Sequence, residues 1–249
     1  MANIPVPKLQ MTIFQARYKT QLSHLGAILP AATQLEQGYP WWQTDGTIMV
    51  EMRDSDTASN ITIDQTSFSY SGMTDNNDHE NSQITKLKDT VAHHFKLKTV
   101  QRIGYRRKYI APVRQRFSDL VTLFHAKTYN QSRGLLEALP EKLDDIHFRV
   151  DSSDEDYKYH ITIGPMVKEQ VSQFLRAEQE RVFAPEDFAK RYLALQDACP
   201  EVFIYFDIDV YQAEEESIEA LTPFVDNART KISKIVTDFC RYIFSEQKG

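Results

Sequence analysis

The chain has 249 residues, 41% of them hydrophobic and 11% aromatic, and a net charge of −6. This length fits one large domain or two small ones, and the aromatic content excludes a disordered chain. No run of about 18 apolar residues is present, which excludes a membrane-spanning helix. The two cysteines, Cys199 and Cys240, predict buried free thiols rather than a disulfide framework.

The first half of the chain predicts strands that alternate with helices. Alternation of Leu9, Met11 and Ile13 with polar neighbours is typical of a half-buried strand. Strands are expected at 8–17, 47–53, 60–70 and 99–111. Helices are expected at 20–27, within 72–95 and at 114–127, and a loop is expected at 30–46 because of its glycines and prolines.

The second half predicts a similar succession and ends in a long helix. Strands are expected at 143–150, 157–164 and 201–211. Helices are expected at 132–138, 167–180, 185–195 and within 214–245. Val225, Ile232 and Phe239 recur at helical spacing in the last segment and predict its buried face.

The order hairpin, helix, strand, helix occurs twice, at 47–127 and at 143–245. We therefore predict an α+β fold of two similar lobes, with antiparallel or mixed sheet and a long C-terminal helix. The lobes would comprise residues 1–128 and 129–249. The first carries 15 Lys and Arg against 11 Asp and Glu, and the second 14 against 24. A basic and an acidic lobe favour an anionic partner or docking between copies, either head to tail or as a dimer.

The predicted strand 99–111 concentrates positive charge. Alternation places Arg102, Arg106 and Lys108 on one face, and the tyrosines of the other face could stack on bases. A phosphorylated ligand or internal carboxylates would both neutralise these cations. The candidate ligand-binding residues are Arg102, Tyr105, Arg106, Arg107, Lys108 and Tyr109.

Asp207 and Asp209 share one face of the predicted strand 201–211. Two carboxylates at this spacing can hold Mg²⁺ or act as an acid and base pair. They can equally form structural ion pairs with the arginines of the 99–111 strand, which has the matching place in the duplication. Both interpretations remain open at this stage.

Trp41 and Trp42 are adjacent in the predicted loop. Such a pair is a candidate interaction site, although it can also fold back over the core. No nucleophile elbow, phosphate-binding glycine loop or zinc-ligand spacing is present, and only 8 glycines occur. We therefore expect no cofactor.

The two charged strands together resemble a sporadically distributed bacterial protein family of unknown function, about 250 residues long. The resemblance rests on Arg102-Ile-Gly-x-Arg106, on Asp207-x-Asp209, and on Phe239 near the end of the long helix. An Asn expected after the second arginine is replaced by Tyr109. The resemblance covers most of the chain but implies no activity and no catalytic residues.

The resulting prediction is a cytoplasmic, non-enzymatic interaction protein that acts through a protein partner or self-association. Residues 1–8 lack the apolar region of a signal peptide, and no membrane contact is expected. The first alternative is binding of a nucleic acid or nucleotide through the 99–111 strand. The second is a metal-dependent enzyme that uses Asp207 and Asp209.

Overall fold

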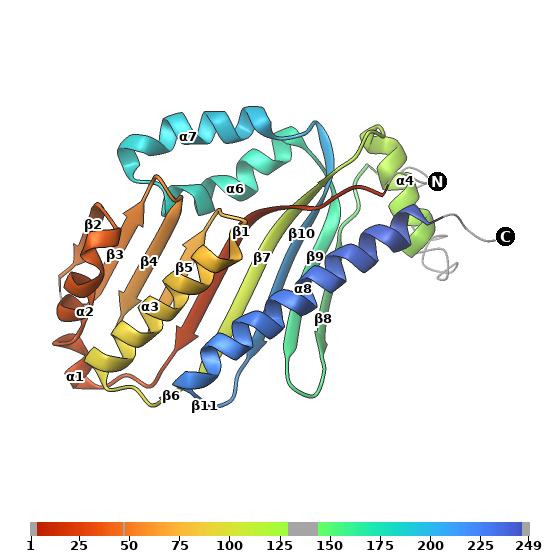
Figure 1. Cartoon of the computed structure of the whole chain (residues 1–249). Helices are drawn as coiled ribbons and strands as arrows, with labels where there is room; N and C mark the ends of the chain where they lie inside the picture. Colours follow the sequence, from red (N-terminus) through yellow and green to blue (C-terminus); the bar gives the residue numbers. More distant parts are fainter. Residues whose placement is uncertain (1–3, 47, 129–143, 246–249) are drawn as a thin grey trace.

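The computed structural model describes residues 4–46, 48–128 and 144–245. Within these ranges nine strands form one sheet in the order β2-β3-β4-β5-β1-β7-β10-β9-β8, and each neighbouring pair is antiparallel (Figure 1). The strands are β1 (Lys8–Arg17), β2 (Trp41–Asp45), β3 (Met49–Asp54), β4 (Ser59–Asp64), β5 (Ser67–Gly72), β7 (Arg102–Pro112), β8 (Phe148–Ser153), β9 (Lys158–Val167) and β10 (Val202–Gln212). Two short strands, β6 (Thr99–Val100) and β11 (Glu216–Ser217), pair separately.

Helices cover both faces of this sheet, which confirms the predicted α+β class. They are α1 (Leu22–Leu25), α2 (Ile28–Leu35), α3 (Asn77–Phe95), α4 (Phe117–Thr128), α6 (Lys168–Val182), α7 (Pro185–Ala198) and α8 (Leu221–Phe244), with short turns η1 (Glu36–Gly38) and η2 (Ile218–Ala220). Within the described ranges, no helix is long and apolar enough to cross a membrane. The expected helix at 132–138 lies outside the described residues.

The helices α2, α3 and α8 lie across one face of the sheet (Figure 1). The α6–α7 pair covers one end of the opposite face. Two neighbours on β3 show this division, because successive strand residues point to opposite faces. Met52 lies beneath α2, whereas the Arg53 guanidinium donates to the carbonyl of Phe183, which directly follows α6 (2.8 Å).

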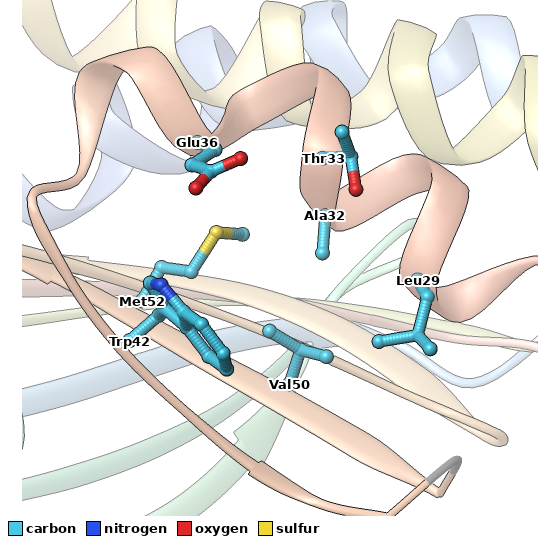
Figure 2. A pocket seen from close by; sticks show the side chains of 7 residues that line it. All are labelled: Leu29, Ala32, Thr33, Glu36, Trp42, Val50 and Met52. Atoms are coloured by element: carbon cyan, nitrogen blue, oxygen red, sulfur yellow. The ribbon is translucent and has the colours of Figure 1, made fainter.

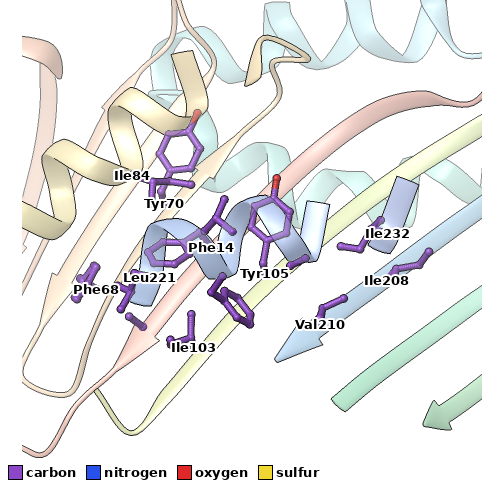
Figure 3. Packing of buried hydrophobic residues seen from close by; sticks show 14 of the residues in the cluster. Phe14, Phe68, Tyr70, Ile84, Ile103, Tyr105, Ile208, Val210, Leu221 and Ile232 are labelled. Atoms are coloured by element: carbon purple, nitrogen blue, oxygen red, sulfur yellow. The ribbon is translucent and has the colours of Figure 1, made fainter. Parts of the chain in front are cut away.

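The main core lies between the sheet and the helices α3 and α8. Figure 3 shows Phe14, Tyr105 and Ile208 of three adjacent strands in one cluster with Leu221 and Ile232 of α8, and Ile208 lies near Ile232. Leu221 and the three strand side chains are buried. The stripe predicted for the last helix is correct in register, since Val225 and Ile232 are buried in this cluster and Phe239 packs against it.

The expected loop at 30–46 is wrong, because this segment contains most of α2, all of η1 and the strand β2. Pro30, one of the prolines on which the expected loop rests, occupies the third position of α2. The N–H groups of a first helical turn have no partner within the helix, so a proline there removes no hydrogen bond.

The expected strand at 60–70 is two strands, β4 and β5. Asp64 causes the break, because its carboxylate accepts hydrogen bonds from the backbone N–H groups of Thr66 (2.6 Å) and Ser67 (2.8 Å). An aspartate that binds the backbone two and three residues ahead stabilises a tight turn. The hairpin β4–β5 follows from this turn.

The two halves of the chain form adjacent parts of one continuous sheet. The first half of the chain supplies six neighbouring strands, in the order β2-β3-β4-β5-β1-β7. The second half supplies the next three, β10, β9 and β8. The repeated order of elements is therefore present, but the placements differ. β1 lies between β5 and β7, whereas β9 and β10 are direct neighbours. The division into two lobes stays a prediction.

Candidate functional site

The charged strands β7 and β10 lie side by side at the centre of the sheet (Figure 1). In their antiparallel register Arg106 lies opposite Asp209, and Lys108 lies opposite Asp207. Opposite charges across a strand pair attract, so this register brings the predicted basic and acidic residues together on one face. That face is the one that α6 and α7 cover only at one end.

Arg106 forms its ion pair with a diagonal neighbour on β10 rather than with Asp209, the residue directly opposite it. Arg106 donates to both carboxylate oxygens of Asp207, from Nε at 2.6 Å and from an Nη at 2.5 Å. Arg102 lies 3.8 Å from Asp209 and stacks over the Tyr211 ring at 4.6 Å. The internal ion pairs that the sequence leaves open are therefore present.

Both ion pairs are partly exposed to solvent. Burial raises the pKa of Asp209, and the nearby charges of Arg102 and Arg106 only partly oppose this rise. The Arg102 and Arg106 side chains are 33% and 39% exposed. A phosphate or a metal ion at this face would compete with contacts that the residues already make. Their ligand-binding and metal-binding roles stay predictions.

The alternate residues of β7 point to the opposite face and are buried beneath α3 and α8. Tyr105, Arg107 and Tyr109 are all less than one-tenth exposed. Lys108, on the Arg106 face, is also only 3% exposed. The predicted basic strand thus divides its residues between two environments, and its tyrosines do not form an open stacking surface.

A buried carboxylate, Glu80 of α3, holds the residues of the covered face. Its two oxygens accept hydrogen bonds from the hydroxyl of Tyr105 (2.5 Å), from Arg107 (2.9 Å) and from Arg229 of α8 (2.8 Å). Burial alone raises the pKa of Glu80, but Arg107 and the hydrogen bonds from Tyr105 and Arg229 hold it below its ordinary value. This buried ionic cluster joins α3, β7 and α8.

Glu80 and Arg229 are absent from the sequence prediction, although the sequence carries a signal for the first. Glu80 precedes Ile84, Leu87 and Val91 at helical spacing, so it extends the apolar stripe of α3 by one turn. A charged residue in a buried stripe requires a partner. Only the fold shows that the partners come from β7 and α8.

Trp41 and Trp42 lie on β2, the edge strand of the sheet, and point to opposite faces. Trp41 contacts the guanidinium of Arg53, whose carbon lies 4.4 Å from the ring centre. Trp42 is 53% exposed. It lines a groove of about 100 Å³ between β2, β3 and α2, together with Leu29 and Met52 (Figure 2).

Metal-ligating residues do not gather elsewhere in the described part of the chain. No group of three or more His, Cys, Asp or Glu side chains is positioned to hold an ion there. Cys199 and Cys240 are both free thiols, as predicted. Cys199 is half-buried and Cys240 is buried.

No protein-family model matches the sequence, and comparison with curated proteins gives no significant match. The resemblance to the sporadically distributed bacterial family therefore stays a prediction.

Proposed function

We propose that the protein is a non-enzymatic interaction protein and that it binds a partner protein at the β2 edge of the sheet. The observation that carries this proposal is a gathering of exposed apolar side chains. Leu22 of α1, Leu29 of α2, Trp42 of β2 and Ile48 after β2 are each 46% to 88% exposed. They come from neighbouring elements at one end of the sheet (Figure 1).

The edge strand offers a second recognition element at the same place. β2 pairs with β3 on one side, and no described strand pairs with it on the other. An edge strand presents free N–H and C=O groups that an extended segment of a partner can pair with. Trp42 and Leu29 would then contact alternate side chains of that segment. A partner that supplies one extended strand with apolar residues fits both features.

Trp42 is the anchor expected to dominate the affinity. Tryptophan is enriched among the few residues that carry most of a protein–protein binding energy, and its truncation commonly costs about 2 kcal/mol or more. This corresponds to a loss of about 30-fold in affinity. Leu193 of α7 is a matched control, because it is an apolar residue of similar exposure (58%) on a different element.

The test combines partner capture with variants of β2. Tagged full-length protein is used to recover stoichiometric partners from its own cells, and sedimentation of the purified protein measures self-association. Trp42→Ala should lose the partner, whether a second copy or another protein, and Leu193→Ala should retain it.

Proline substitutions test the added strand itself. Successive strand residues direct their N–H groups to opposite sides, so one of Gln43→Pro and Thr44→Pro removes a donor from the outer edge. That variant should lose the partner while its melting temperature stays near that of the wild type. A protein that sediments as a monomer and retains no partner, or a partner unaffected by Trp42→Ala, would contradict the proposal.

A further inference from the structure

A cavity of about 620 Å³ lies between α7 and one end of the sheet, apart from the β2 groove. Its walls come from the start of β1, the end of β7, the β3–β4 turn and the second half of α7. Small-molecule sites commonly have volumes of about 300–1,000 Å³, so the cavity has the size of such a site. The lining residues that bear on its ligand are Lys8, Leu9, Ile110, Arg191, Ala194 and Cys199.

The lining is mainly apolar. Leu9 and Ile110 supply the sheet side, and Ala194 lies on α7 opposite them. Phe183, between α6 and α7, also contributes to the wall. Binding sites for small molecules share this composition, in which an apolar wall carries a few polar groups that fix orientation.

The charged residues of the lining are both cations, Lys8 and Arg191, and no acidic side chain that the structure describes lines the cavity. Lys8 makes no ion pair with any residue that the structure describes. Arg191 lies 3.4 Å from Asp56, whose side chain is 96% exposed. An exposed pair of this kind contributes little, so the guanidinium can exchange this contact for a ligand.

We propose that this cavity binds an amphipathic anion, that is, a carboxylate with an apolar tail. The tail would lie against Leu9, Ile110 and Ala194. The carboxylate would pair with Lys8 and Arg191, because positive charge and the absence of acidic lining residues favour an anionic head group. An uncharged head group would gain no charge attraction from Lys8 and Arg191, and a cationic one would be repelled by them.

Cys199 provides a direct readout of occupancy. It lines the cavity and is half-buried, and burial raises the pKa of its thiol. The other thiol, Cys240, is fully buried, and burial raises its pKa to about 11. A thiol reagent at pH 8 should therefore label Cys199 in the folded protein and leave Cys240 unmodified. A ligand in the cavity should slow the labelling of Cys199.

The experiment measures this labelling rate in the full-length protein with three probes. Decanoate carries both the tail and the anionic head, decylamine carries the tail with a cationic head, and acetate carries the head alone. Decanoate should slow labelling at least fivefold, and the other two should not. Equal protection by decylamine or by acetate, or no protection by decanoate, overturns the proposal.

Variants separate the cavity from other apolar surfaces. Lys8→Ala and Arg191→Ala should each weaken decanoate binding about tenfold, which is the loss of one charged hydrogen bond. Lys158→Ala, on the exposed part of β9, is the matched control and should bind as the wild type does. Ala194→Trp should fill the cavity and abolish binding, and calorimetry of the wild type with decanoate measures the affinity independently of labelling. Unchanged decanoate affinity in both cation variants overturns the assignment of the head-group site.

Discussion

The buried cluster around Glu80 predicts a large and measurable loss of stability. Glu80→Gln keeps the size of the side chain and removes its charge, which leaves two guanidinium groups without their shared carboxylate. Removal of one partner from a buried ion pair costs about 3–5 kcal/mol. Arg107 also donates to Asn77 (2.7 Å) and Arg229 to Asp226 (2.9 Å). We therefore expect the lower end of the range, about 3 kcal/mol.

The measurement is the free energy of unfolding from guanidinium denaturation followed by circular dichroism. Glu180→Gln is the matched control, because Glu180 pairs with Arg176 on the surface (3.0 Å) and should change stability by less than about 0.5 kcal/mol. If Glu80→Gln were equally mild, the carboxylate would not be holding the two arginines, and the reasoning from burial and geometry would be refuted.

The pH dependence of the free energy of unfolding, compared between the wild type and Glu80→Gln, gives an independent test. The pKa of Glu80 is lower in the folded state than in the unfolded state. Its contribution is therefore fully present above the unfolded pKa of about 4.3 and is lost as the pH falls toward the folded pKa. The stability difference between the wild type and Glu80→Gln should shrink in this acidic window. A difference that does not vary with pH would contradict an ionised Glu80.

Further predictions concern the backbone and the carboxylate pair. Lys96 ends α3 with a φ of +53°, a conformation that costs a residue with a side chain about 1 kcal/mol, so Lys96→Gly should raise the free energy of unfolding by about 0.5–1 kcal/mol, whereas Lys98→Gly should not. Asp207→Asn should destabilise by about 1 kcal/mol more than Asp209→Asn, because Asp207 accepts two hydrogen bonds from Arg106, whereas Asp209 lies 3.8 Å from Arg102. In a carboxyl NMR titration Asp209 should take up its proton above the ordinary aspartate value of about 3.9, and a lower value would contradict its burial.

The sequence predicts elements best where their two faces differ. The strand β1 and the helices α3 and α8 each have one buried and one exposed face, and their periodicity is evident without a structure. The edge strand β2 is mostly exposed on both faces, so its residues show no alternation that could be recognised. The β2 site of the proposed function therefore coincides with an element that the sequence does not predict.

The sequence offers the arginines of the 99–111 strand as partners for Asp207 and Asp209, but it does not predict which residues contact each other. Arg106 and Asp207 are 101 positions apart, and their contact depends on the register between β7 and β10. Composition and alternation place each residue on a face of its own strand, but they contain no information on how the two strands align. The same limit applies to Arg107. Alternation places it on the opposite face from Arg106, but it does not indicate that Glu80 of α3 is its ion-pair partner.

The position of β7 has a consequence for the order in which the chain is made. β7 leaves the ribosome about 100 residues before β10, the strand that completes its pairing. A sheet formed in this interval from the strands that precede β10 would have β7 as its edge, and the cations Arg102 and Arg106 would disfavour pairing of that edge with other chains. The carboxylates of Asp207 and Asp209 neutralise this protection only when β10 arrives. The cations that form ion pairs in the finished sheet would thus disfavour edge-to-edge pairing while β10 is still absent.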